Sequence, residues 1–128
     1  MTLKNAINWF EIPVDDYERA IAFYENIMQC ELKRELKREV MDCCDMAVFP
    51  ADEIAVGGAL VKADFLKPRD AGCVIYLNVE GMIDGVLQRA QEQAAEILFP
   101  KTHIGEAGYI AHIADSEGNR IGLHSMVS

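Results

Sequence analysis

The sequence predicts an α+β domain built from two βαβββ halves, and three observations lead to this prediction. A strand, an acidic turn and an amphipathic helix follow one another in residues 8–26, and a looser copy begins about half a chain later. The hydrophobic patterns of the two halves match at offsets of 64 or 65 residues: 10–16 with 75–81, 48–52 with 112–116, and 57–61 with 121–125. Because one half is too small to cover its own sheet, the two halves are expected to pair.

The first half opens with a strand whose two faces differ in character. Its apolar face, expected to meet the core, carries Phe10, Ile12 and Val14. The opposite face mixes Trp9 and Glu11 with Pro13, which is unusual for a face that points only at water. Asp15 and Asp16 follow as expected caps of a helix over 17–28, and Glu18 stands three residues after Asp15, as in a capping box.

The remaining elements follow from apolar runs and turn residues. In the first half, strands are predicted over 30–36, 39–49 and 57–61, and a linker over 67–72. The second half predicts a strand over 73–80 that is apolar enough to be covered on both faces, followed by a helix over 83–94 with a poorer cap. A strand over 95–100 that is broken by Pro100 and a hairpin around residues 115–118 complete the second half.

Length and charge restrict the classes of protein to which the chain can belong. At 128 residues the chain is predicted to be a single domain, 1–128, made of repeats over about 5–65 and 70–127. A net charge of −9 repels phosphate backbones, so no nucleic-acid partner is expected. No run approaches the roughly 20 apolar residues of a membrane helix, and the first residues do not resemble a signal peptide. We therefore expect no membrane partner and a cytoplasmic location.

The four cysteines do not form a familiar metal or redox motif. They are Cys30, Cys43, Cys44 and Cys73, and no two are separated by two residues. Zinc ribbons and thioredoxin-type sites both use that separation, so neither is expected here.

Two segments give the chain a family resemblance. The segment VDDYERAIAFY over 14–24 and the segment DSEGNRI over 115–121, supported by YLNV over 76–79, resemble the vicinal oxygen chelate superfamily. This superfamily includes glyoxalase I, bleomycin-resistance proteins and extradiol dioxygenases. The chain is most similar to its short, single-domain bacterial members, which are described only as glyoxalase-related. The resemblance implies that the two βαβββ modules curl into a mixed-sheet cup with two covering helices, and that the protein is a homodimer.

The resemblance also places four positions at which metal-dependent members carry their ligands. On this chain the positions fall on Trp9, Gly58, Val74 and Gly122. None of these residues has a side chain that binds a metal ion, so we expect neither a metal nor another cofactor. Glyoxalase-type isomerisation and extradiol cleavage both need a Lewis acid, so the metal mechanism of the family is not expected here.

The main hypothesis is therefore a metal-free cup that binds, and in one version transforms, a small organic molecule. The inward-facing residues that would form its floor are Trp9, Glu11, Tyr76, Asn78, Arg120 and His124. A flat aromatic surface, several hydrogen-bonding groups and one titratable histidine suit a small aromatic or polar ligand. The sequence assigns neither the ligand nor a catalytic residue.

Two alternatives remain open. Glu11 and His124 each lie two residues from a family ligand position, so they could form an acid–base pair or a displaced metal site in a metal-dependent lyase, isomerase or dioxygenase. The chain could instead be a non-catalytic interaction or sequestration module with a degenerate pocket. Of the other histidines, His112 lies on a strand whose inward face the sequence does not assign, and His103 is expected in a loop.

Overall fold

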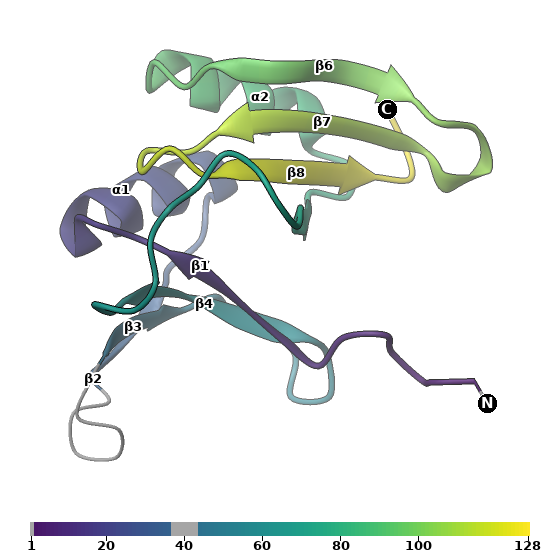
Figure 1. Cartoon of the computed structure of the whole chain (residues 1–128). Coiled ribbons are helices and arrows are strands. Elements are labelled where there is room, and N and C mark those ends of the chain that lie inside the picture. The colour runs from purple at the N-terminus through teal and green to yellow at the C-terminus, as the bar shows by residue number, and fades with distance from the viewer. Residues whose placement is uncertain (1, 37–43) are drawn as a thin grey trace.

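The computed structural model describes residues 2–36 and 44–128 and contains two successive βαβββ modules (Figure 1). The first module comprises β1 (Trp9–Pro13), α1 (Tyr17–Met28), β2 (Lys33–Leu36), β3 (Asp45–Val48) and β4 (Gly57–Lys62). The second comprises β5 (Tyr76–Asn78), α2 (Ile83–Glu92), β6 (Ile97–His103), the 3-10 turn η2 (Gly105–Ala107), β7 (Tyr109–Ala114) and β8 (Arg120–Ser125). Residues 39–43 of the strand expected over 39–49 lie outside the described residues.

Each module forms one four-stranded mixed sheet of the same topology. The strand orders are β1-β4-β3-β2 and β5-β8-β7-β6, with the first pair parallel and the others antiparallel. The two sheets diverge on the side where both chain ends lie (Figure 1). The expected α+β class, with two helices and eight strands in mixed sheets, is confirmed.

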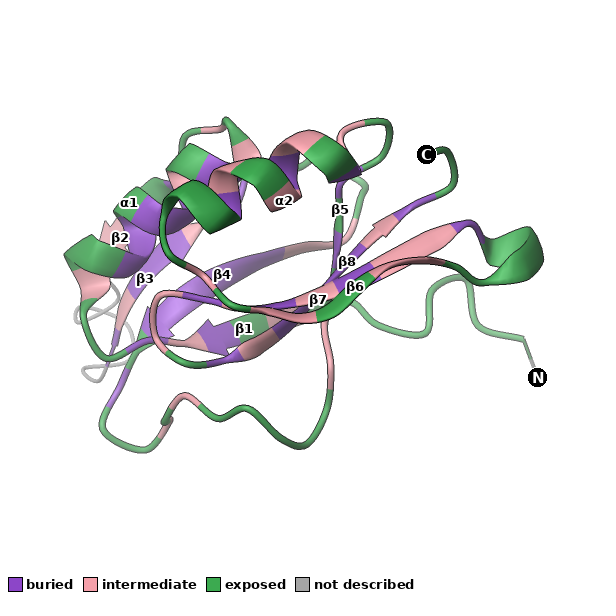
Figure 2. Cartoon of the chain, turned by 90° about the horizontal axis from the view of Figure 1, so that it is seen from above, coloured by how far each residue is buried: buried purple, intermediate pink, exposed green. Residues whose placement is uncertain are grey.

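Both modules share one hydrophobic core beneath the helices. Helices α1 and α2 lie side by side over the same side of the two sheets (Figure 2). The core joins Ile12 and Leu60 of the first sheet to Leu77 and Leu123 of the second, and Tyr24 of α1 is fully buried within it. Burial of side chains of this size is worth roughly 1.5–3 kcal/mol each. The sheet faces opposite the helices, called the open faces below, carry most of the predicted site residues.

Helix α1 begins at the turn that the sequence predicts. Asp16 is its N-cap, and the Asp16 carboxylate accepts a hydrogen bond from the backbone N–H of Arg19 at 3.0 Å. Glu18 does not reach back as a capping box would; it forms an ion pair with Arg34 on β2. The helix ends at Met28, and its C-cap Gln29 has a left-handed φ of 53°.

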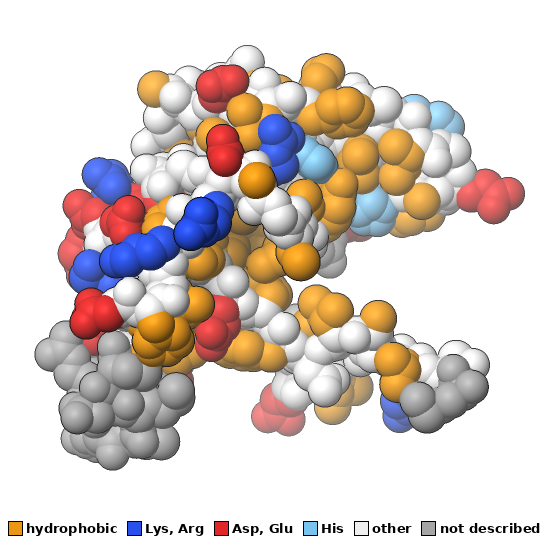
Figure 3. All heavy atoms as spheres, viewed as in Figure 1, with side chains coloured by type: hydrophobic (Ala, Val, Ile, Leu, Met, Phe, Trp, Pro, Cys, Tyr) orange, Lys and Arg blue, Asp and Glu red, His pale blue; other side chains and the backbone are white. Residues whose placement is uncertain are grey.

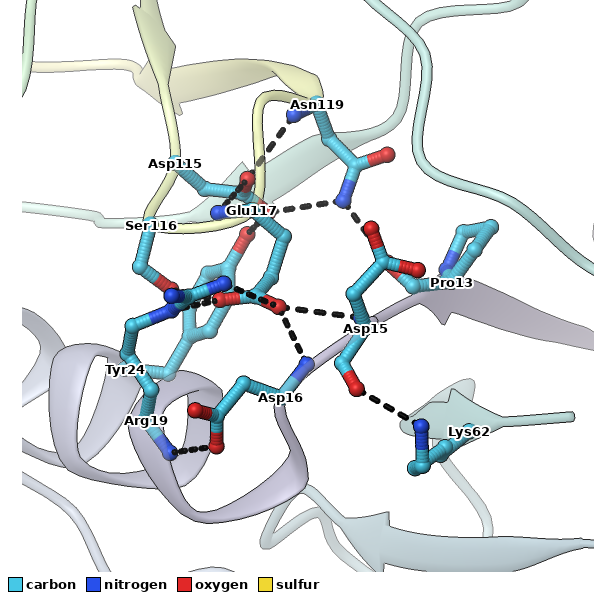
Figure 4. Close-up of polar contacts among 10 residues, drawn as sticks. All are labelled: Pro13, Asp15, Asp16, Arg19, Tyr24, Lys62, Asp115, Ser116, Glu117 and Asn119. Atoms are coloured by element: carbon cyan, nitrogen blue, oxygen red, sulfur yellow. Dashed lines mark hydrogen bonds and ion pairs between the residues drawn. The ribbon is translucent and has the colours of Figure 1, made fainter.

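The start of α1 is also bound by the turn between β7 and β8 of the other module (Figure 4). The carboxylate of Glu117 accepts hydrogen bonds from the backbone N–H groups of Asp15 and Asp16 at 2.9 and 2.6 Å. The same carboxylate accepts from the Arg19 guanidinium at 2.7 and 3.1 Å, and the Glu117 side chain is fully buried. One carboxylate therefore fixes the β7–β8 turn of the second module against the first helix.

A second set of contacts from the same turn lies beside Glu117. The Tyr24 hydroxyl donates to the Asp115 carboxylate at 2.6 Å, and Asn119 donates from its side-chain amide to the Pro13 carbonyl at 2.8 Å. Asp115 and Asn119 are buried and hydrogen-bonded to each other. The predicted turn is confirmed, with Gly118 at a φ of 91°. We refer to Asp115, Glu117 and Asn119 as the turn clamp.

The strand predicted over 73–80 is shorter and less buried than expected. Regular pairing covers only Tyr76–Asn78, because β5 pairs with β8 along one edge and has no partner along its other edge among the described residues. The prediction that both of its faces are covered is wrong, since Leu77 faces the core while Tyr76 and Asn78 are exposed. Leaving this edge unpaired separates β5 from β1.

The strand containing Pro100 continues where a break was predicted. β6 runs through Pro100 to His103, with irregular register between Ile97 and Thr102. A proline is tolerated because β6 is the outermost strand of its sheet, where a missing N–H and a bulge cost little. His103 is therefore the last residue of a strand and not part of a loop. No helix among the described residues is long and apolar enough to cross a membrane.

Replacing Glu117 with glutamine should weaken the contact between the modules. Burial raises the pKa of Glu117, but hydrogen bonds from Arg19, Asp16, Ser116 and Asp15 outweigh it and lower the pKa below its ordinary value of 4.5. Glutamine removes the charge that these donors bind, so we expect the free energy of unfolding at pH 7 to fall by about 2 kcal/mol in urea titrations. The exposed Glu106→Gln variant is the control and should match the wild type.

The pH dependence gives an independent check. Because the folded pKa of Glu117 is lowered, its contribution to stability is complete above pH 4.5 and disappears as the pH falls through the folded pKa. The difference between wild type and Glu117→Gln should therefore shrink below pH 4.5. A difference that is the same at pH 3 and pH 7 would contradict the role given to this carboxylate.

Candidate functional site

A cavity lies between the two modules, where β1 and β5 are not paired. Its volume is about 860 Å³. Its walls are mainly apolar and come from both sheets, from the C-terminal end of α1 and from the N-terminal end of α2. They include Phe49, Val56, Ile75, Met28 and Met82. The hollow between the two halves is open on the side of the chain ends, with hydrophobic side chains around it (Figure 3).

Four of the six predicted site residues line this cavity. Trp9 and Glu11 project from the open face of β1, and the indole Nε1 of Trp9 donates to the Glu11 carboxylate at 3.2 Å. Tyr76 and Asn78 project from the open face of β5, and the Asn78 side chain accepts from the backbone N–H of Glu80 at 3.0 Å. The structure therefore brings together residues that are more than 60 positions apart in the sequence.

Arg120 lines a smaller cavity of about 210 Å³ beside the first. Glu11, Cys73 and Ile75 line both cavities, so the two spaces adjoin at these residues. The guanidinium of Arg120 donates to the carbonyl oxygen of Asp70 at 3.3 Å, which ties β8 to the segment between the modules.

His124 lines neither cavity. Its ring lies on the open face of β8, where His124 pairs in register with Asn78, and its Nε2 donates to the carbonyl oxygen of Ala107 at 2.6 Å. This contact with η2 occupies one of the two ring nitrogens. The structure thus places His124 beside the predicted site and not in its cavity.

The residue that sequence reasoning missed is His112. It lies on β7, opposite Gly122 of β8, and its Nε2 is 2.8 Å from the Tyr76 hydroxyl oxygen. Its Nδ1 is 3.1 Å from Nη1 of Arg120. The alternation along β7 was the available signal, because Ala111 and Ile113 are buried and force His112 to the open face.

The absence of a side chain at Gly122 allows Tyr76 to reach His112. A Cβ atom built on Gly122 would lie 2.4 Å from Cδ1 of the Tyr76 ring, so the ring lies directly over this glycine. Gly122 pairs with Tyr76 on one side and with His112 on the other. The three residues therefore form one row across the open face of the second sheet.

The environment of His112 disfavours its protonation. Burial is the larger cause and the charge of Arg120 the second, and together they lower the pKa of His112 below its ordinary value of 6.5. The ring is therefore neutral at pH 7.

The comparisons with known proteins identify the family. Residues 6–123 match the family model described as the Glyoxalase/Bleomycin resistance protein/Dioxygenase superfamily. The chain belongs to this superfamily. No curated protein matches the chain in sequence.

Solved structures of the same fold resemble the chain over nearly its whole length. A glyoxalase family protein from Bacillus cereus is 20% identical, with all of both chains covered and a TM-score of 0.68. Leishmania major glyoxalase I, described as trypanothione-dependent, is 18% identical, with 96% of this chain and 88% of that chain covered and a TM-score of 0.66. An antibiotic binding protein from a Streptomyces species is 21% identical, with 98% of both chains covered and a TM-score of 0.62.

The residues at the metal positions of the superfamily do not fit a metal ion. Trp9 and Val74 offer no ligand atom, and the space above Gly122 is filled by the Tyr76 ring. The placement of Gly58 in this set is wrong, because its missing Cβ points at the Phe10 ring on the helix side, 2.4 Å away. In the structure β4 and β8 match at an offset of 63 residues and not 64, so Leu60 is equivalent to Leu123 in the core. Gly58 is therefore not the equivalent of Gly122.

The structure adds no third ligand to the displaced metal site that Glu11 and His124 could form. Among the described residues, no group of three or more His, Cys, Asp or Glu side chains is close enough together to bind a metal ion.

Adding a methyl group at Gly122 should displace Tyr76. We expect Gly122→Ala to lower the free energy of unfolding by about 1–3 kcal/mol in urea titrations, because the ring must move out of the Cβ position. Gly57→Ala is the matched control, since its Cβ would make an ordinary contact at 3.5 Å with the Trp9 ring. A Gly122→Ala protein as stable as Gly57→Ala would show that Tyr76 does not lie over this glycine.

Proposed function

We propose that the chain, as one domain over 1–128, binds a small organic molecule in the cavity between its modules without a metal ion. The observation that carries this proposal is the cavity itself, which has a volume of about 860 Å³ and mainly apolar walls. Pockets for small ligands have this size and character, with a few polar groups that orient the ligand. Trp9, Glu11, Tyr76 and Asn78 would supply those groups here.

The open cavity favours this proposal over that of an interaction module with a degenerate pocket. A degenerate pocket would be filled by side chains, whereas Trp9 and Tyr76 are each 45% exposed at the hollow. A relative of the same fold also bears on the choice, since it is an antibiotic binding protein. Sequestration or conversion of a compound of low molecular mass is therefore the class of activity that we propose.

Trp9 provides a direct probe of ligand binding. It is the single tryptophan of the chain and lines the cavity, so an aromatic compound that enters should change its fluorescence in a saturable way. We expect this change with para-tert-butylbenzamide and other apolar aromatic compounds. In Cys73→Phe the added ring should fill the junction of the two cavities and lower the affinity about tenfold or more.

Two controls make this experiment decisive. Gln91→Phe adds the same ring at an exposed position of α2 and should leave binding unchanged. Metal analysis of the protein purified without chelators separates the alternative mechanism. A stoichiometric metal that is lost in Glu11→Gln and His124→Gln would overturn the metal-free proposal, and binding that is unaffected by Cys73→Phe would overturn the proposed location.

We also propose that the protein is a homodimer. Large apolar side chains remain exposed near both chain ends, including Leu3, Ile7, Met126 and Val127. Contact with a second copy of the chain would remove these apolar surfaces from water. Light scattering should give twice the chain mass of 14.3 kDa, and a mass of one chain at micromolar concentration would contradict the proposal.

A further inference from the structure

The open face of the second sheet carries a hydrogen-bonded chain, of which the proposed binding role uses only Tyr76. It runs from Tyr76 on β5 through His112 on β7 to Arg120 on β8, with contacts of 2.8 and 3.1 Å. The Phe99 ring packs against His112 with a centroid separation of 5.6 Å. Histidines and hydrophobic side chains lie together on this part of the surface beside the hollow (Figure 3).

The direction of these hydrogen bonds follows from the chemistry of arginine. A guanidinium has only donors, so Nδ1 of His112 must accept the bond from Arg120. A neutral ring then carries its proton on Nε2, which donates to the Tyr76 oxygen. The hydroxyl proton of Tyr76 is left without a protein acceptor among the described residues. It is available to an acceptor on a ligand.

The local charge beside Tyr76 is opposite to that of the whole protein. Lys67, Arg69 and Arg120 line the smaller cavity together with a single carboxylate, that of Glu11. The chain as a whole has a net charge of −9. Within residues 2–36 and 44–128, Arg120 forms no ion pair within 4.0 Å. Its charge is therefore available to an anion at the junction of the two cavities.

We propose that Tyr76 and Arg120, positioned by His112, form an anion site that binds the carboxylate of an aromatic acid whose apolar body occupies the cavity between the modules. The inference rests on the proposed function and specifies the class of ligand. Tyr76 lines the large cavity and Arg120 the smaller one, and the two cavities adjoin, so a molecule whose body fills the first can direct its carboxylate toward the second. Hydrogen bonds from a guanidinium and a phenol to a carboxylate are charge-assisted and short.

Glu11 restricts the ligand further. Its carboxylate lies at the same junction and accepts a hydrogen bond from Trp9. Lys67, Arg69 and Arg120 outnumber this carboxylate around the smaller cavity, so one ligand carboxylate is attracted on balance. A second carboxylate close to Glu11 would be repelled, so the site should prefer an acid with one carboxylate.

A matched pair of probes tests the charge of the ligand separately from its shape. We would measure the affinities of para-tert-butylbenzoate and para-tert-butylbenzamide by calorimetry at pH 7.5. The acid should bind about tenfold or more tightly than the amide, because only the acid carries a negative charge that pairs with the guanidinium of Arg120. Binding of the amide alone supports the cavity and rejects the anion site, whereas binding of neither compound rejects both.

Variants assign the preference to particular side chains. Arg120→Gln and Tyr76→Phe should each weaken binding of the acid more than binding of the amide, so that the ratio of acid to amide affinity falls at least about threefold. Two control variants should keep the wild-type ratio. Arg34→Gln removes an arginine charge from β2 of the first sheet, and Tyr109→Phe removes a tyrosine hydroxyl from β7. An unchanged ratio in Arg120→Gln would overturn the proposal.

The positioning role of His112 has its own test. Glutamine can accept from Arg120 and donate to Tyr76, as the neutral imidazole does, whereas leucine can do neither. We expect His112→Gln to retain most of the preference for the acid and His112→Leu to lose it, with melting temperatures recorded for both. Equal ratios in the two variants would show that His112 acts only in packing.

Discussion

The hydrogen bonds between the turn clamp and the start of α1 are the constraint on which the rest of the structure depends. No strand of the first sheet pairs with a strand of the second among the described residues, so pairing between strands does not set the angle between the modules. The carboxylate of Glu117 and the side chains of Asp115 and Asn119 join them instead, together with the shared core beneath the helices. These contacts join the modules at the start of α1 and leave β1 and β5 unpaired, and the cavity lies between those two strands.

A missing side chain determines the chemistry of the open face. Where metal-dependent relatives are expected to carry a metal ligand, this chain has Gly122, and the ring of Tyr76 occupies the space. The same glycine lets the Tyr76 hydroxyl reach His112 and, through it, Arg120. The second sheet therefore presents hydrogen-bond donors to a ligand instead of donor atoms to a cation. Such a surface suits recognition of negative charge.

Periodicity and turn chemistry were enough to predict most of the fold. The alternation in β1, the Asp16 cap and the turn at Gly118 all depend on neighbouring residues, and all three are confirmed. The exposure of Tyr76 and the face of Gly58 depend on which strands pair and in what register, which an offset between similar halves does not fix. His112 was missed for the same reason, because it contacts Tyr76 and Arg120, which are 36 and 8 residues away in sequence and lie on other strands.

The central claim is that the cavity between the modules is open to a ligand, and that Tyr76 and Arg120 donate hydrogen bonds to the carboxylate of that ligand. A crystal structure of the protein with para-tert-butylbenzoate tests it most directly. The account predicts that the hydrocarbon body lies between β1 and β5 and that the carboxylate is within hydrogen-bonding distance of the Tyr76 hydroxyl and the Arg120 guanidinium. A structure in which β1 and β5 pair and close the hollow, or in which side chains there coordinate a metal ion, would contradict it.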